Sequence, residues 1–299
     1  MKKLIALLTV GMLVLTGCSG KGGAPAGGAT YKIGTGIVTG VRNSDVGEKP
    51  GKFESNVTYA TVALEGDKIA FVSIDTNQNE LTFTADAINA FVAKGTKKEL
   101  GKDYRMNWDE QIAKLEEYLV GKTLAEVKAE TAATDLTSTV SITIDGYIEA
   151  VQLAAEAAVE VKNVAKIAQT STVSADVSKA PAVEINTVVS VVALDADGKI
   201  VHSFLDEAQL KATIEGGKVT PDANGKTKGQ LKEAYGMSGA GKVEWYKQVQ
   251  TLTEWTIGRT AADLAKVQDD ADVTSKVSIY TGNLVSTLEK AIKEAKAVK

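Results

Sequence analysis

The sequence predicts an α+β fold, with two similar domains in tandem and, in each domain, an antiparallel sheet packed against helices. Three observations lead to this class. Pairs of β-branched segments flank short polar turns, amphipathic segments closed by glycine follow these pairs, and the whole pattern occurs twice within the 299 residues. We therefore treat each copy as one structural unit.

The repeat is defined by constant spacing. Ten residues between Trp108 and Ile142 recur 137 positions later, between Trp245 and Ile279. Further upstream the offset is 131, as for Asp75 with Asp206. The difference of six corresponds to one insertion, near residues 238–242. Co-linearity of this extent indicates a duplicated domain.

The N-terminus predicts export and a lipid anchor. Lys2 and Lys3 precede a short apolar run, residues 4–15, as in a signal peptide. The run ends in Leu-Thr-Gly-Cys18, which resembles the lipobox of bacterial lipoproteins, in which the cysteine thiol carries diacylglycerol. The resemblance implies a signal peptide at 1–17, lipidation of Cys18 with palmitate among the acyl chains, and an extracytoplasmic protein anchored to the cell membrane at the bacterial surface.

The segment after the anchor predicts a flexible tether. Residues 18–30 are rich in glycine and cannot bury apolar surface. Because Cys18 is the only cysteine, the protein has no thiol left for disulfides or metal thiolates. Without Lys2 and Lys3, 32 basic residues face 38 acidic ones, a net charge of about −6. This balance argues against nucleic acid as a partner.

The strands are predicted from β-branched segments. In the first repeat, 56–64 and 68–74 flank a Glu-Gly-Asp turn, which indicates a hairpin, and 188–194 and 199–204 repeat it. Residues 33–41 predict an additional strand, whose glycines are expected where a neighbouring element approaches closely.

The helices are predicted after the hairpins. Residues 109–120 and 246–257 are followed by glycines, Gly121 and Gly258, suited to left-handed C-caps. Capping boxes are expected to open short helices at Thr123 and Thr260, where the third following residues are Glu126 and Asp263.

Each copy is expected to end in a helix, at 146–159 and 284–297. We expect the first repeat to span 31–160, a linker to span 161–182 and the second repeat to span 183–299.

Several familiar motifs are absent from the sequence. Gly121-Lys-Thr does not close a phosphate loop, because Glu116 stands where the first glycine belongs. His202 is the only histidine, and its counterpart in the first repeat is Phe71, so we expect it to be a strand residue. A single histidine cannot build the usual triads, metal clusters or haem attachments. We predict no catalytic constellation, no haem and no metal cluster, and hence not an enzyme.

The repeated phrase Asp-x-Thr-Ser-x-x-Ser-Ile carries a family resemblance. It is similar to the Asp-x-x-Ser-Gly-Ala-Thr-x-Thr signature of FMN-binding domains in bacterial respiratory and extracellular electron-transfer proteins. The match places Ser141 and Ser278 at the threonine that directly follows Gly-Ala, while Thr139-Val140 and Lys276-Val277 replace Gly-Ala. The resemblance implies FMN-binding-like repeats at about 31–160 and 183–299.

In that family a transferase joins the phosphate of FMN to a threonine hydroxyl of the signature. The resemblance therefore implies a flavoprotein with a flavin transferase and redox partners, and with candidate flavin-binding residues in both repeats: Asp135, Thr137, Ser138 and Ser141; Asp272, Thr274, Ser275, Lys276 and Ser278. Two functions stay open. One is electron transfer through flavin attached to serine, and the other is a non-catalytic binding or structural lipoprotein that kept the scaffold and lost the flavin.

Overall fold

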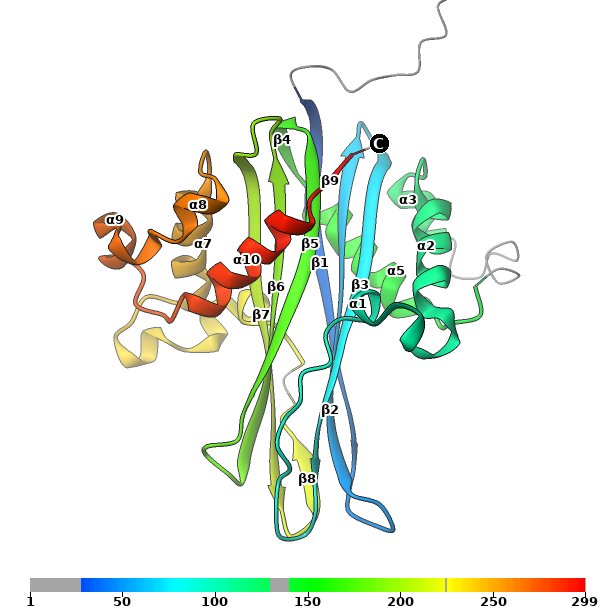
Figure 1. Cartoon of the computed structure of the whole chain (residues 1–299), viewed down its shortest axis with the longest axis vertical. Helices are drawn as coiled ribbons and strands as arrows, with labels where there is room; N and C mark the ends of the chain where they lie inside the picture. Colours follow the sequence, from blue (N-terminus) through cyan, green and yellow to red (C-terminus); the bar gives the residue numbers. More distant parts are fainter. Residues whose placement is uncertain (1–27, 130–139, 224, 299) are drawn as a thin grey trace, which may run out of the picture.

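The computed structural model describes residues 28–129, 140–223 and 225–298 and contains two antiparallel sheets with helices packed against them. The predicted α+β class is therefore confirmed. Figure 1 shows the long strands of both sheets side by side in the centre of the molecule and the helices on the two flanks.

The first sheet has the strand order β3-β2-β1-β4, and every neighbouring pair is antiparallel. Its strands are β1 (Ala29–Ser44), β2 (Gly51–Glu65), β3 (Lys68–Phe83) and β4 (Val159–Val164). The predicted hairpin is β2 and β3, joined at Gly66, whose φ of 65° suits a glycine turn.

The second sheet repeats this order. Its strands run β8-β7-β6-β5-β9, so β7-β6-β5-β9 corresponds to β3-β2-β1-β4 and β8 is an extra edge strand. They are β5 (Lys166–Asp176), β6 (Ala182–Leu194), β7 (Ile200–Glu215), β8 (Lys218–Pro221) and β9 (Lys296–Ala297). His202 lies in β7, as predicted.

The helices follow the same duplication. The first repeat contains α1 (Lys97–Leu100), α2 (Trp108–Leu119), α3 (Leu124–Ala129) and α5 (Asp145–Glu156). The second contains α6 (Lys228–Leu231), α7 (Trp245–Thr256), α8 (Ala261–Leu264), α9 (Ala271–Thr274) and α10 (Gly282–Glu294). Short 3-10 turns connect them at Gly101–Asp103, Arg105–Asn107, Lys232–Tyr235, Ser238–Ala240 and Val267–Asp269.

The predicted helix signals are confirmed at both C-termini and at both capping boxes. Gly121 and Gly258 follow α2 and α7 with φ of 85° and 79°. The Thr123 amide donates to Glu126 at 2.7 Å, and the Thr260 amide donates to Asp263 at 3.0 Å.

Two kinds of apolar core hold the protein together. Each repeat has an outer core between its sheet and its helices, centred on Trp108 in the first and Trp245 in the second. A further core lies between the two sheets, where Phe53 and Tyr59 of the first sheet pack with Ile185 and Leu210 of the second. The repeats therefore share a core, as in a β-sandwich.

The linker predicted at 161–182 is wrong. This segment contains most of β4, all of β5 and the start of β6, and β5 pairs with β6 from Lys166 to Asp176. β5 lacks the apolar pattern that identifies a buried strand, because its central residues Thr170 and Ser171 are polar although their side chains are buried. The second sheet consequently begins at Lys166, well before residue 183.

The predicted C-terminal ends of the last helices are also wrong. The helix expected at 146–159 ends at Glu156, and the one expected at 284–297 ends at Glu294. The residues beyond them form β4 and β9, which pair with β1 and β5. In both repeats the chain thus returns to the edge of its own sheet.

The glycines of β1 are required by close contact, as the sequence predicts. A Cβ on Gly36 would lie 2.1 Å from the Ala150 carbonyl oxygen and 2.7 Å from the Leu153 Cβ in α5. A Cβ on Gly34 would lie 2.0 Å from the Ala154 carbonyl oxygen. A Cβ on Gly40 in the same strand would meet no atom within 4 Å.

We predict that Gly36→Ala destabilises the protein by about 3 kcal/mol, because α5 must move off β1 to admit the methyl group. Urea unfolding followed by circular dichroism measures this change. Gly40→Ala is the matched control and should change the unfolding free energy by less than about 0.5 kcal/mol. Equal effects of the two substitutions would contradict the close packing of α5 on β1.

Candidate functional site

The serines that match the flavin-carrying position lie at equivalent places. Ser141 precedes α5 and Ser278 precedes α10, each in a turn, and both residues are exposed. Val140 and Val277, which replace the alanine of the signature, are buried in the two outer cores. The added bulk at these positions therefore packs inward.

A glutamine side chain holds each of these turns. The Oε1 atom of Gln248 accepts hydrogen bonds from the Ser278 amide at 2.6 Å, the Ser278 hydroxyl at 3.3 Å and the Ile279 amide at 3.1 Å. Its amide nitrogen donates to the Val243 carbonyl at 2.6 Å. Gln248 is almost fully buried, so its side chain is fixed between α7 and the turn.

The first repeat contains the same contact. Gln111 Oε1 accepts from the Ser141 amide at 2.7 Å, the Ser141 hydroxyl at 3.2 Å and the Ile142 amide at 3.2 Å. The Gln111 amide nitrogen donates to the Met106 carbonyl at 2.6 Å. This geometry explains why the glutamine and the Ser-Ile pair recur together at one offset.

The rest of the signature is described only in the second repeat, since Asp135, Thr137, Ser138 and Thr139 lie outside the described residues. There, Asp270 rather than Asp272 caps α9, accepting from the backbone amides of residues 272 and 273. The hydroxyl of Thr274 donates to the Asp270 carbonyl at 3.0 Å, and that of Ser275 donates to the Asp272 carbonyl at 3.3 Å. These side chains stabilise their own helical turn and are not brought together around Ser278.

Two exposed side chains flank Ser278. Lys276, which stands at the glycine position of the signature, is exposed and does not adopt a positive φ, so it fits the turn without backbone strain. Tyr280 is 80% exposed. The corresponding residues of the first repeat are Thr139, which lies outside the described residues, and Thr143. Only the second repeat therefore places a cation and an aromatic ring in sequence around its serine.

A second duplicated polar site was missed by the sequence prediction. Asp206 is 5% exposed and accepts from the Thr227 hydroxyl at 2.6 Å, the Gly229 amide at 2.8 Å and the Glu207 amide at 2.7 Å. Its counterpart Asp75 is 6% exposed and also receives backbone amides. Each aspartate lies beside the first turn of a short helix, α6 or α1.

The signal for this site was present in the sequence. Thr96 and Thr227, like the two aspartates, differ by 131 positions, and each starts a capping box, with Glu99 and Gln230 as third following residues. Burial raises the pKa of the Asp206 carboxyl to about 6 and also raises the pKa of the Asp75 carboxyl. Their hydrogen bonds fix α6 and α1 against the sheets.

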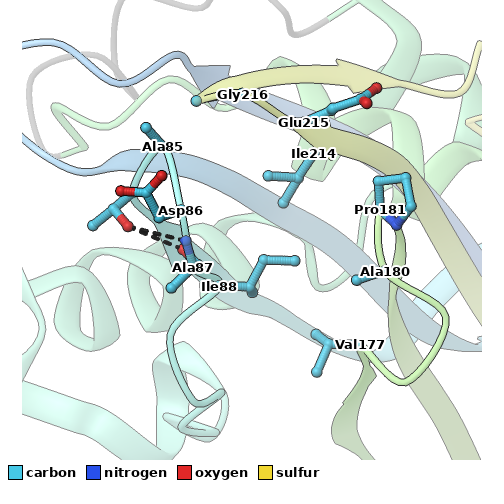
Figure 2. Close-up of a pocket in the computed structure, with 12 residues that line it drawn as sticks. Ala85, Asp86, Ala87, Ile88, Val177, Ala180, Pro181, Ile214, Glu215 and Gly216 are labelled. Atoms are coloured by element: carbon cyan, nitrogen blue, oxygen red, sulfur yellow. Dashed lines mark hydrogen bonds between the residues drawn. The ribbon is translucent and has the colours of Figure 1, made fainter.

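Two of the hollows that the described residues form lie between the repeats, away from these turns. The first, of about 530 Å³, lies where three loops meet at the end of the sandwich (Figure 2). None of its lining side chains is aromatic, and the drawn hydrogen bonds join Thr84 to Ala87 within one loop. The second, of about 410 Å³, lies between the two repeats and is lined by aromatic residues of β7 and α7.

The described residues contain no group of three or more histidine, cysteine or acidic side chains arranged to hold a metal ion. Within these same residues, no helix is both long and apolar enough to cross a membrane. Comparison of the chain with protein-family models, with curated proteins and with solved structures found no match. The flavin-domain resemblance and the lipobox therefore stay predictions.

We predict that Gln248→Ala lowers the unfolding free energy by about 2 kcal/mol, because two backbone amides and one hydroxyl lose their shared acceptor. Ser278→Ala should cost less than about 1 kcal/mol, since both amides keep their bonds to Gln248. Urea unfolding of the two variants tests this difference. A Ser278→Ala variant as unstable as Gln248→Ala would show that the hydroxyl, rather than the glutamine, holds the turn.

We also predict a pH effect from Asp206. An unfolded aspartate titrates near pH 4 and the folded one near 6, so between these values only the folded state binds the proton. Protonation of Asp206 adds about 3 kcal/mol to the free energy of unfolding below about pH 4, and this contribution is lost as the pH rises through about 6. Urea unfolding of wild type and Asp206→Asn at several pH values measures it. Between about pH 4 and 6 the free energy of unfolding of the wild type should fall relative to that of Asp206→Asn. A difference between the two proteins that does not change with pH would contradict the raised pKa of Asp206.

Proposed function

We propose that this protein is a lipid-anchored, extracytoplasmic electron carrier in which FMN is joined as a phosphoester to Ser278. The observation that carries the proposal is the exposed Ser278 hydroxyl, held before α10 by Gln248. A serine hydroxyl provides the same oxygen nucleophile as the threonine of the resembling family. The lipobox resemblance at Cys18 supplies the membrane anchor.

The surroundings of Ser278 suit a phosphate ester in three respects. The hydroxyl donates a hydrogen bond to Gln248, so the lone pairs of its oxygen point away from Gln248. Lys276 adds a positive charge close in sequence to a dianionic phosphate. The exposed ring of Tyr280 offers a stacking surface for an aromatic cofactor.

The same surroundings call for a separate transferase. The partner of the Ser278 hydroxyl is an amide oxygen, which cannot accept a proton as a general base near neutral pH. When bound, FMN would supply the redox chemistry, and this chain would supply attachment and position. The protein itself then acts as a carrier between redox partners and not as a catalyst.

A second function is favoured by one specific observation. The contact between Gln248 and Ser278, and its copy in the first repeat, accounts for both serines without any cofactor. In this alternative the protein is a non-catalytic binding or structural lipoprotein, and the serines only order the entry to α5 and α10.

We predict that the protein purified from its native host carries the added mass of one FMN phosphoester. Ser278→Ala should remove this mass and the flavin absorbance, whereas Ser141→Ala, the matched change in the first repeat, should retain both. Intact-mass spectrometry and a visible spectrum provide the readout. An unmodified mass in a host that possesses the transferase would establish the structural alternative.

A further inference from the structure

The hollow between the repeats has a distinctive lining. It lies between β1 and α5 of the first repeat and β7, α6 and α7 of the second. Three aromatic side chains line it, namely Phe204, Trp245 and Tyr246, together with aliphatic groups such as Leu153 and Val249. Its volume of about 410 Å³ falls in the range of small-molecule sites. None of the described residues of the flavin signature lines it.

Three polar side chains that line this cavity, those of Asp206, Gln230 and Thr35, are bonded within the protein. Asp206 receives its three donors, as described above. Gln230 donates to the Ile37 carbonyl at 2.9 Å and accepts from the Thr227 amide at 3.0 Å. The Thr35 hydroxyl lies 3.4 Å from that of Thr61. A ligand is therefore recognised here mainly by its apolar surface.

The charges near the cavity leave one cation at its rim. Lys228, whose ammonium lies 5.6 Å from the centre of the Trp245 ring, is paired with Glu207 at 2.9 Å. Lys232 lines the cavity and is exposed, and among the described residues no carboxylate forms an ion pair with it. An acidic group on a ligand would thus meet a positive charge at Lys232.

The duplication provides an internal comparison. The offset of 137 pairs Leu153 of the cavity with Lys290 in α10, and the offset of 131 pairs Gln230 with Glu99 in α1. Lys290 and Glu99 form an ion pair across the repeats. The positions of Leu153 and Gln230 at the cavity are therefore occupied by an ion pair, Lys290 with Glu99, at the equivalent place on the other side of the molecule.

Other paired positions differ in the same direction. In the first sheet Gly36, which lies in the cavity wall, pairs with Ala60. The offset of 131 relates Ala60 to Val191, which pairs with Gln169 in the second sheet. Gln169 therefore occupies the position in the second repeat that Gly36 occupies in the first. The offsets also relate Phe204 to Ser73. One side thus carries a salt bridge and a glutamine, while Phe204 and Leu153 line the hollow on the other side.

We propose that the cavity lined by Phe204, Trp245, Tyr246 and Leu153 is a binding site for a small planar aromatic molecule carrying one acidic group. The aromatic body lies among these side chains, and the acidic group lies at Lys232. The site is independent of flavin attachment at Ser278, and it gives the protein a second, non-covalent ligand.

The test uses 8-anilinonaphthalene-1-sulfonate, an aromatic sulfonate whose fluorescence rises in apolar surroundings. A chain starting at residue 19 contains every described residue and carries no lipid. Titration of this protein should show saturable binding of one probe molecule. The double variant Leu153→Lys with Gln230→Glu installs the counterpart of the Lys290–Glu99 ion pair and should weaken binding at least tenfold. Lys232→Ala should weaken it severalfold.

Val120→Lys is the matched control, because it places a lysine at an exposed apolar position of the first repeat, outside the cavity lining. It should leave binding unchanged. If the double variant does not fold, Ala157→Phe, which fills the cavity from the end of α5, should produce the same loss. Unchanged binding in the folded cavity variants, or equal loss in Val120→Lys, would assign the probe to general surface adhesion and overturn the proposal.

Discussion

The packing of one sheet against the other is the interaction on which the rest of the structure depends. Phe53 and Tyr59 are completely buried between the sheets, and none of the described helices contributes a buried residue to this core. The core is also tied by polar contacts, because the Tyr59 hydroxyl and the Asn77 amide both reach the Ser171 hydroxyl of the other sheet, at 3.1 and 3.0 Å. Separating the repeats would expose these aromatic side chains and leave buried polar groups without partners. The duplicated units therefore stabilise each other, and they are tandem in sequence but joined in one core.

The shared core makes the two repeats tolerant of differences between them. The parts that hold each unit together, such as Gln111 with Ser141 and Gln248 with Ser278, are nearly identical in geometry. The contacts differ at a place where an element of one repeat meets the other repeat. At that place Lys290 and Glu99 form a salt bridge on one side of the molecule, and the equivalent residues on the other side are Leu153 and Gln230. Because the inter-sheet core supplies the association, either set of contacts is compatible with joined repeats.

The sequence predicted local features well and the connection between the repeats poorly. The hairpins, α2, α7 and their closing glycines depend on residues close in the chain, so periodicity and capping residues identify them. β5 was missed because its side chains face a partly polar core, where Thr170 and Ser171 are buried, and the pattern of an apolar strand is lost. The ends of α5 and α10 were misplaced because pairing with β1 and β5 overrides helix propensity. The role of Gln248 needed three-dimensional contacts between residues 30 positions apart.

The contact at Ser278 is compatible with both proposed functions, and the reason is the distribution of its hydrogen bonds. Gln248 holds the turn mainly through the amides of Ser278 and Ile279, at 2.6 and 3.1 Å, whereas the hydroxyl bond is longer, at 3.3 Å. Forming a phosphoester removes only the hydroxyl proton and its bond, a loss of about 1 kcal/mol. The backbone bonds and the buried Val277 would keep the turn in place. A duplicated structural contact could therefore acquire a covalent cofactor on one exposed oxygen without any rearrangement of the fold.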